Sequence, residues 1–334
     1  MRTARALSLF LLAALPLLFW DCGGTHGDES DGVLTIAVIP KGTTHEFWKS
    51  IHAGALQARE VLANEGVQVK ILWKGPQKED DREQQITLVE DIINRGVSGI
   101  VLAPLDETSL VRPVAESAAA SIPVVVIDSG LRGDKHVSFV ATDNYKGGAL
   151  AARHLGTLLG GKGRIIMLRY QEGSESTMQR EKGFIDVMKA EFSGIEIASD
   201  NQYGGATTES SYQKAEALLN LFPDIDGIFC PNESTTFGML RALQVSNRAG
   251  KVKYVGFDSS VKLVEAMRAG QIHGLILQNP FKMGSLGVRT LVDHLQGKRV
   301  EERIDTGIAL VTPENMDTPE MKELHSPDLG RWLK

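Results

Sequence analysis

Runs of lysine and arginine are missing from this 334-residue chain, whose formal net charge is −6. Nucleic-acid-binding proteins usually carry a basic patch that neutralises phosphates, so the charge argues against a nucleic-acid partner. The acidic side chains are spread along predicted helices, as on an ordinary solvated surface. The length leaves room for two domains, and we expect a monomeric protein that binds no nucleic acid.

Cysteine is almost absent, because the chain has only Cys22 and Cys230. Cys230 belongs to the apolar run IDGIFCPN and is predicted to be a buried thiol on a strand. Cys22 lies in a flexible leader, so a disulfide between the two is not expected. Neither cysteine stands in a nucleophile motif, and no serine does.

Motifs for catalysis, metals and cofactors are also missing. HEFWK begins with His45 and Glu46 but lacks the second histidine that a zinc-protease helix needs. The eight histidines are scattered and form no cluster of ligands. The glycine-rich GGKGR at 160–164 lacks Ser or Thr after its lysine and precedes a strand, which predicts an ordinary loop. We therefore expect no metal, no cofactor and no enzymatic activity.

Long hydrophobic runs are confined to the N-terminus, where one extends from Ala6 to Trp20. It follows Arg2 and Arg5, and it is too short for a comfortable membrane span. A basic start followed by such a run is typical of a secretion signal. We expect residues 1–21 to be a signal peptide and the protein to be exported.

Cys22 directly follows that run and precedes Gly-Gly and the polar spacer THGDESDG. This arrangement resembles a bacterial lipoprotein signal, in which the cysteine is acylated and becomes the new N-terminus. Asp21 stands where such signals usually have a small residue. Residues 22–32 are therefore expected to be a flexible tether lipidated at Cys22, with ordinary cleavage and a soluble product as the alternative.

Short β-rich runs alternate with amphipathic helical stretches from Val33 onward. Continuous apolar strands in such a pattern indicate parallel sheets covered on both faces, and two similar series fit two doubly wound α/β lobes. The first series is 34–39, 67–73, 99–103, 124–127 and 136–141. The second series is 164–168, 195–199, 227–230, 253–257 and 274–277.

A helix at 280–296 and a strand at 304–310 have no obvious partners in the second series. The chain is therefore expected to return to the first lobe, and the tail 312–334 to form only short turns. The expected N-terminal lobe is 33–142 plus 279–306. The expected C-terminal lobe is 143–278 plus 307–334, the latter including the tail.

Aromatic residues make up only 6% of the chain, so the adjacent Phe47 and Trp48 stand out. They follow the strand 34–39 and open a predicted helix. In open α/β sheets, ligands bind just beyond the carboxyl ends of the strands, where this turn lies. Two large aromatics exceed what a helix start needs, and they predict a platform for the apolar face of a ligand.

Polar residues end four of the predicted strands: Asp128, Asn232, Asp258 and Gln278. Any one alone is more often a helix cap or a turn former. Four in the same structural position indicate a shared ligand site. Arg180, near the first long helix of the second series, is predicted to add a donor, although an arginine considered alone is more often a surface residue.

The chemistry of this set favours a neutral polyol. The two aspartates accept hydrogen bonds, Asn232 and Gln278 both donate and accept, and Arg180 donates. A sugar has hydroxyls that donate and accept, and C–H faces that lie against aromatics. Two carboxylates against one guanidinium disfavour an anionic ligand, and an amino-substituted polyol fits second best.

Several segments of the chain, in the order in which they occur, resemble the ribose-type periplasmic binding proteins of bacterial sugar ABC importers over residues 33–311. The motifs are HEFWKSIHAGA, PVVVIDSG, VATDNYKGG, QREKGF, IFCPNESTTFGMLRAL, VGFDSS and ILQNPFKMGSLGV. The resemblance implies the type I periplasmic binding protein fold, with two Rossmann-like lobes joined by three hinge strands and closing over a monosaccharide. The ligand residues that it implies are Phe47, Trp48, Asp128, Arg180, Asn232, Asp258 and Gln278.

Three departures from the ribose pattern concern the same site. Ribose binders often follow the first-lobe Asp with Arg, and this chain has Ser129. They usually have Asn-Pro before the aromatic pair, and this chain has His45 and Glu46. An aromatic of the second lobe is expected near 203–206, where Tyr203 is close. The departures point to another sugar or polyol and add His45 and Ser129 to the expected site.

The resemblance implies capture of a monosaccharide or related polyol and its delivery to an ABC transporter permease. The protein would lie in the periplasm or cell envelope and contact the membrane only through a lipid on Cys22. The alternative is a sugar sensor that presents its closed form to a chemoreceptor or sensor kinase. A transcription regulator of this fold needs a helix-turn-helix before the first lobe, where this chain has a signal and spacer.

Overall fold

The computed structural model describes residues 32–333, so the predicted signal peptide and Cys22 lie outside the described part. The described residues form two six-stranded sheets. The first contains β1 (Leu34–Ile39), β2 (Val69–Trp73), β3 (Gly99–Leu102), β4 (Val124–Ile127), β5 (Ser138–Ala141) and β11 (Arg303–Asp305). The second contains β6 (Lys162–Arg169), β7 (Gly194–Tyr203), β8 (Gly227–Phe229), β9 (Lys253–Phe257), β10 (Gly274–Leu277) and β12 (Ala309–Val311).

The two sheets have equivalent strand orders, β11-β5-β4-β3-β1-β2 and β12-β10-β9-β8-β6-β7. All neighbouring strands are parallel except β12, which runs antiparallel to β10. We call the first sheet and its helices the N-terminal lobe, and the second sheet and its helices the C-terminal lobe. Equivalent orders place equivalent strand ends at the same point of each lobe.

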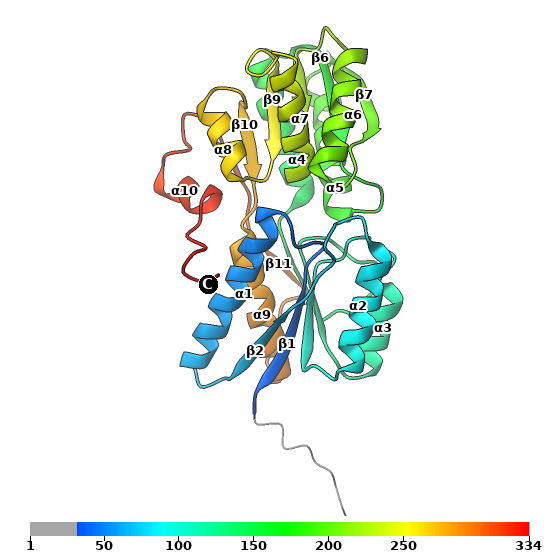
Figure 1. The fold of residues 1–334 in the computed structure, drawn as a ribbon, viewed down its shortest axis with the longest axis vertical. Helices are drawn as coiled ribbons and strands as arrows, with labels where there is room; N and C mark the ends of the chain where they lie inside the picture. Colours follow the sequence, from blue (N-terminus) through cyan, green and yellow to red (C-terminus); the bar gives the residue numbers. More distant parts are fainter. Residues whose placement is uncertain (1–31, 334) are drawn as a thin grey trace, which may run out of the picture. The chain divides into compact units, whose positions relative to one another are not determined.

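Helices cover both faces of each sheet (Figure 1). In β1, Ile36 and Val38 pack on one face while Ala37 and Ile39 pack on the other, because successive strand residues point to opposite sides. The N-terminal lobe has α1 (Glu46–Asn64) and α9 (Pro280–Leu295) on one face, and α2 (Arg82–Asn94) and α3 (Val111–Ala119) on the other. The C-terminal lobe has α4 (Asn144–Leu158) and α5 (Glu175–Glu191) on one face, and α6 (Thr208–Leu221), α7 (Glu233–Val245) and α8 (Val261–Arg268) on the other. No helix among residues 32–333 combines the length and the hydropathy that crossing a bilayer requires.

The chain passes between the two sheets three times, after β5, after β10 and between β11 and β12. Two of these crossings contact each other, because the Thr142 hydroxyl lies 3.2 Å from the Thr306 hydroxyl and donates to the Gly307 carbonyl at 3.0 Å. The predicted fold class, two doubly wound lobes with three connections, is confirmed. The lobe boundaries stay predictions.

The predicted single strand at 304–310 is wrong. It consists of two three-residue strands, β11 in the first sheet and β12 in the second. Gly307 lies between them with φ 88°, in the left-handed region that favours glycine and interrupts extended backbone. A continuous β-rich pattern therefore concealed a crossing between lobes.

The prediction of only short turns in the tail is also wrong, because Pro319–His325 forms a helix, α10. The Thr318 hydroxyl accepts a hydrogen bond from the Met321 amide at 3.4 Å, and proline occupies the first helical position. Met321 and Leu324 pack against the C-terminal core. A helix this short is marginal alone, so tertiary packing stabilises it.

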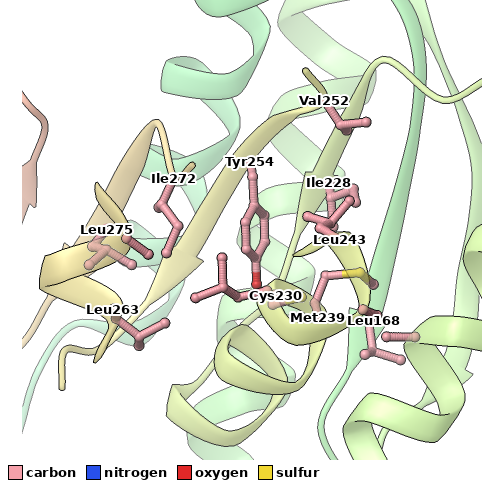
Figure 2. Packing of buried hydrophobic residues seen from close by; sticks show 14 of the residues in the cluster. Leu168, Ile228, Cys230, Met239, Leu243, Val252, Tyr254, Leu263, Ile272 and Leu275 are labelled. Atoms are coloured by element: carbon pink, nitrogen blue, oxygen red, sulfur yellow. The ribbon is translucent and has the colours of Figure 1, made fainter. Parts of the chain in front are cut away.

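Cys230 directly follows β8 and is fully buried, as predicted for this thiol. Figure 2 shows it in the C-terminal core with Leu168, Met239 and Tyr254. Burial raises the pKa of the thiol to about 12. The side chain therefore acts as a small apolar residue and not as a nucleophile.

Paired glycines let helices approach closely in both lobes. A Cβ at Gly54 on α1 would lie 1.9 Å from the Phe281 carbonyl oxygen of α9, and one at Gly284 on α9 would lie 2.0 Å from the Ile51 oxygen of α1. In the C-terminal lobe, Gly148 and Gly183 pair α4 with α5 in the same way. In the N-terminal lobe, this contact positions the start of α1, which carries the aromatic pair.

We expect Gly54→Ala to destabilise the protein by about 1–3 kcal/mol, because the added Cβ forces α1 and α9 apart. The higher helix propensity of alanine, worth about 1 kcal/mol, offsets only part of this cost. The denaturant midpoint measures the change. Glu60→Ala, on the exposed side of the same helix, should stay within about 0.5 kcal/mol; equal effects of both substitutions would contradict the close-packing argument.

Candidate ligand-binding cleft

Two aspartates occupy equivalent positions in the two sheets. Asp128 follows β4 and Asp258 follows β9, and these strands hold the same place in the two strand orders. Their φ angles are 65° and 66°, in the left-handed region that Asp tolerates better than most residues. Both are buried, with 3% and 7% exposed. The carboxyl ends of the two sheets thus each contribute one carboxylate.

Both aspartates line one cavity of about 30 Å³ between the lobes. That volume is close to the share of one liquid water molecule, so the surrounding side chains largely contact one another. Among residues 32–333, no group of His, Cys, Asp or Glu side chains is arranged to hold a metal ion. Eight of the nine predicted ligand residues line this cavity: His45, Phe47, Trp48, Asp128, Arg180, Asn232, Asp258 and Gln278.

Lys41, which the sequence reasoning missed, neutralises Asp128. Its ammonium Nζ lies 3.0 Å from Asp128 Oδ2 and donates to the hydroxyls of Ser176 at 3.2 Å and Ser174 at 3.4 Å. Lys41 comes from the N-terminal lobe, and the two serines lie at the start of α5 in the C-terminal lobe. The three partners of the ammonium group come from both lobes, so Lys41 connects the lobes in the closed cleft.

Ser129, the ninth predicted residue, lies beside the cavity and also connects the lobes. Its hydroxyl accepts a hydrogen bond from the Ser176 backbone amide at 3.1 Å. The next residue, Gly130, donates its amide to Glu175 Oε2 at 2.9 Å. The turn after β4 therefore contacts the first turn of α5.

Glu79 joins the predicted aromatic pair to the C-terminal lobe. It lies in the loop between β2 and α2 and is 6% exposed. Its carboxylate accepts hydrogen bonds from His45 Nδ1, Trp48 Nε1 and the Tyr170 hydroxyl. Tyr170 directly follows β6, so this buried carboxylate has partners in both lobes.

The His45–Glu79 contact is an ion pair. Burial alone would lower the pKa of His45, but the adjacent Glu79 carboxylate outweighs it and raises that pKa to about 9. Burial alone would raise the pKa of Glu79, but His45 and the hydroxyl and indole donors lower it to about 2. Both groups are therefore ionised near neutral pH, and His45 is a cation in the cleft.

Asp258 is the centre of the C-terminal wall. Its carboxylate accepts the Gln278 side-chain amide at 2.7 Å and the Glu233 backbone amide at 3.1 Å, and Arg180 Nη1 lies 3.8 Å away. Burial raises the pKa of Asp258, while the Arg180 guanidinium and these donors oppose the rise. The carboxylate is therefore held in place by partners from three segments.

Arg180 is buried and fixed by its own partners. It donates to Asn144 Oδ1 and to the Pro231 carbonyl, both at 2.9 Å. Its guanidinium carbon lies 3.9 Å from the centre of the Phe257 ring, a cation–π contact. The predicted donor is thus a positioned cleft residue and not a surface arginine.

Gln278 leaves one polar atom without a partner. Its Nε2 donates to Asp258, while its Oε1 makes no hydrogen bond and is one of only two such buried side-chain atoms among residues 32–333. The residue is 3% exposed. A buried carbonyl oxygen without a donor is costly, so a hydrogen-bond donor placed at this atom would stabilise the cleft.

The aromatic pair is divided between cleft and core. Phe47 and Trp48 meet edge to face with centroids 4.9 Å apart. Both line the cavity, but Trp48 is buried in the core of the N-terminal lobe while Phe47 packs partly against it. Phe47 therefore offers the more accessible ring face.

Asn232 lines the cavity and also caps α7. Its Oδ1 accepts the Thr235 hydroxyl at 2.6 Å and the Thr235 amide at 3.3 Å, while its Nδ2 donates to the Ser234 hydroxyl at 3.0 Å. These local bonds are those of a helix N-cap. One Nδ2 hydrogen remains for other partners.

Two glutamates make reciprocal contacts across the cleft. Glu233, at the start of α7, accepts the α1 amides of Glu46 at 3.4 Å and Phe47 at 3.3 Å. Glu46 in turn accepts the Val261 amide at the start of α8 at 3.2 Å. Carboxylates are favourable at helix N-termini. Burial raises the pKa of Glu233 to about 7, although nearby His45 opposes the rise.

The sequence contained a signal for some of the missed residues. Lys41 and Tyr170 stand just beyond β1 and β6, the same strand-end position that marked Asp128 and Asp258. Glu79 lies in an irregular loop and carried no such signal. Tyr203, the aromatic near 203–206, is 38% exposed and lines a different cavity. Tyr170 is the aromatic that the C-terminal lobe contributes to this cleft.

Residues 36–299 match the family model described as periplasmic binding protein domain. The chain belongs to the periplasmic binding protein family. The D-ribose/D-allose-binding protein of Pseudomonas aeruginosa is 30% identical over 322 residues, covering 92% of this chain and 99% of that protein. The ribose import binding protein of Bacillus subtilis is 27% identical, with 92% and 96% covered.

Solved structures agree with this membership. An ABC transporter solute-binding protein of Agrobacterium vitis, solved with bound D-fucose, has a TM-score of 0.83 at 35% identity, covering 87% of this chain and 99% of that one. A carbohydrate transporter solute-binding protein of Agrobacterium radiobacter, in complex with D-arabinose, has a TM-score of 0.83 at 32% identity, with 88% and 99% covered. The type I periplasmic binding protein fold and the prediction of a binding protein, not an enzyme, are confirmed.

The ion pair of His45 and Glu79 makes stability depend on pH. The folded-state pKa of His45, about 9, exceeds its ordinary 6.5, so this contribution is full below pH 6.5 and is lost as the pH rises through 9. The folded-state pKa of Glu79, about 2, is below its ordinary 4.5, so this contribution is present above pH 4.5 and is lost as the pH falls through 2. The pair therefore stabilises most between pH 4.5 and 6.5.

We expect His45→Gln to lower the free energy of unfolding at pH 6 more than at pH 9, measured by urea unfolding across that range. The double variant His45→Gln with Glu79→Gln provides the control, because coupling between the two sites should shrink towards pH 9. Parallel pH curves for the wild type and His45→Gln would show that the imidazolium contributes nothing.

Proposed function

We propose that this protein is an extracytoplasmic solute-binding protein that captures a monosaccharide or related polyol by lobe closure and delivers it to an ABC transporter permease. Its relatives support this role, because they include ribose- and allose-binding proteins, and similar solved structures hold D-fucose and D-arabinose. A xylitol-binding protein of Mycolicibacterium smegmatis, 26% identical over 75% of this chain, extends the range to polyols.

The observation that carries the proposal is the matched charge of the buried cleft. Each cation lies beside a carboxylate, so the cleft as a whole favours a neutral ligand that can both donate and accept hydrogen bonds. Glu233, whose pKa burial raises to about 7, adds only a partial charge near neutrality. The three pairs are Lys41–Asp128, His45–Glu79 and Arg180–Asp258.

A sugar supplies the hydrogen bonds that the cleft lacks. Its hydroxyls can donate to Gln278 Oε1, which has no partner among the described residues. They can also accept from His45 Nε2–H, because Nδ1 is occupied by Glu79. Phe47 offers a ring face to the sugar C–H groups. Site residues of this kind reject analogues that leave buried groups unpaired.

Capture requires lobe movement, because a 30 Å³ cavity is too small for a monosaccharide. Opening about the three crossings separates Tyr170 from Glu79, and Lys41 from Ser176. A sugar that then contacts both aspartates binds the closed form better than the open one. That difference in affinity drives closure, as in other hinged binding proteins.

The position of the cationic group of Lys41 favours a ligand other than ribose. Ribose binders often place an arginine directly after the first-lobe aspartate, and this chain has Ser129 there. The Lys41 ammonium, 3.0 Å from Asp128, supplies a cationic donor from a different strand end. A point charge on a flexible stem and a planar guanidinium recognise different hydroxyl arrangements.

Asp258→Ala is expected to weaken sugar binding by about 2–5 kcal/mol, roughly 30- to 4000-fold, because it leaves Arg180 and Gln278 without their buried partner. A thermal-shift screen of pentoses, hexoses, inositols and sugar alcohols first identifies the ligand. A ligand present at 100 times its dissociation constant stabilises the folded protein by about 2.7 kcal/mol. Calorimetry then measures the affinity of the wild type and of Asp258→Ala for that ligand.

The matched control is Asp134→Asn, an exposed loop carboxylate, which should bind like the wild type. Circular dichroism verifies that both variants fold. Unchanged affinity in folded Asp258→Ala would refute the site, and a screen without any stabilising sugar would refute the function.

We also propose that Cys22 carries a lipid that tethers the exported protein to the membrane. Cys22→Ser should move the protein from the membrane fraction to the soluble fraction of a bacterial host and abolish incorporation of labelled palmitate. Cys230→Ser, which removes the buried thiol, is the control and should leave both unchanged. Soluble, unlabelled wild-type protein would favour simple signal cleavage.

A further inference from the structure

A second and larger cavity adjoins the proposed sugar cleft. It measures about 300 Å³, at the lower end of the range for ligand pockets. Phe47, Asp258 and Gln278 line both spaces, so these three side chains form a shared wall. We call the larger space the side compartment. The cavity beside Tyr203 shares only Tyr170 with the cleft, so the side compartment has the larger common wall.

The side compartment has mainly apolar walls from three parts of the molecule. The shared Phe47 contributes from the N-terminal lobe. The remaining apolar members come from the start of α8, the end of β10, the start of α9 and the tail: Val261, Leu277, Pro280, Leu324, Pro327 and Leu329. The polar members include the charged Glu46, Lys49 and Asp258 as well as Ser50, Ser259 and Ser326, but apolar groups make up the larger part of the lining surface.

The tail that closes the compartment is anchored on both lobes. Buried His325 lies with Nε2 2.9 Å from the Met316 carbonyl, and Leu324 packs against the C-terminal core. Beyond the compartment, the centroid of the Trp332 ring lies 6.2 Å from that of Phe281 on α9 of the N-terminal lobe. Leu329 therefore lies on a segment held at both ends, so the wall is part of the folded structure.

Gln278 connects the two spaces chemically. Its Oε1 is buried without a partner, at the wall that separates the compartment from the cleft. A sugar hydroxyl bound beside Asp258 could donate a hydrogen bond to this atom. A substituent on that sugar could then extend past Phe47 into the compartment.

We propose that the side compartment receives the apolar aglycone of a glycoside whose sugar occupies the cleft. The inference rests on the proposed sugar-binding function and narrows its substrate class to glycosides with a small alkyl or aryl group. The matched ion pairs recognise the sugar, and the apolar compartment rewards burial of the aglycone. A second sugar ring would place some of its hydroxyls against the apolar part of these walls, where they would lack partners.

The first test compares D-ribose, D-allose, D-arabinose and D-fucose with the methyl and phenyl glycosides of the tightest binder, in both anomers, by calorimetry. One phenyl anomer is expected to bind at least about tenfold tighter than its methyl counterpart, because its ring is buried. If both phenyl anomers bind more weakly than the free sugar, the aglycone proposal is overturned while the proposed function stands. If no sugar or glycoside binds, both are overturned.

The second test fills the compartment without touching the cleft. Leu329→Trp should remove the phenyl-over-methyl preference while leaving the affinity for the free sugar within about threefold, because Leu329 lines only the compartment. The control is Leu221→Trp, which adds the same ring at a position 70% exposed on the far end of α6. A preference that survives Leu329→Trp in a protein with wild-type circular dichroism would place the aglycone elsewhere and refute the inference.

Discussion

The buried carboxylate of Glu79 is the interaction on which the closed cleft depends. It neutralises His45 and accepts a hydrogen bond from the Trp48 indole of its own lobe. It also accepts a hydrogen bond from the Tyr170 hydroxyl of the other lobe. A desolvated carboxylate needs all these donors, because an unpaired buried charge would cost several kcal/mol. One group therefore fixes the aromatic wall and holds the two lobes together.

The other charged side chains of the cleft are likewise paired with groups of the protein itself. Lys41 satisfies Asp128, Arg180 accompanies Asp258, and Glu233 caps the first helix of the opposite lobe. A ligand therefore exchanges existing partners for its own hydroxyls and does not simply fill an empty space. Selectivity then depends on how well a sugar replaces bonds that the protein already makes, which penalises sugars with misplaced hydroxyls.

The symmetry of the two lobes explains why the fold was the most predictable part. Alternating apolar strands and amphipathic helices indicated both sheets, and most predicted elements lie within two residues of the observed ones. The failures have physical causes. Gly307 breaks a pattern that looked like one strand, and α10 forms because Met321 and Leu324 pack on a distant core.

The sequence by itself determined which side chains stand at the carboxyl ends of the strands, because strand periodicity puts Asp128, Asp258 and Gln278 there in any parallel arrangement. Only the tertiary structure decided their partners. Glu79 and Tyr170 are 91 residues apart, and a loop residue carries no periodic signal of the partner that it will meet. Such pairing depends on how the two sheets face each other, which is a property of the closed molecule and not of any local segment.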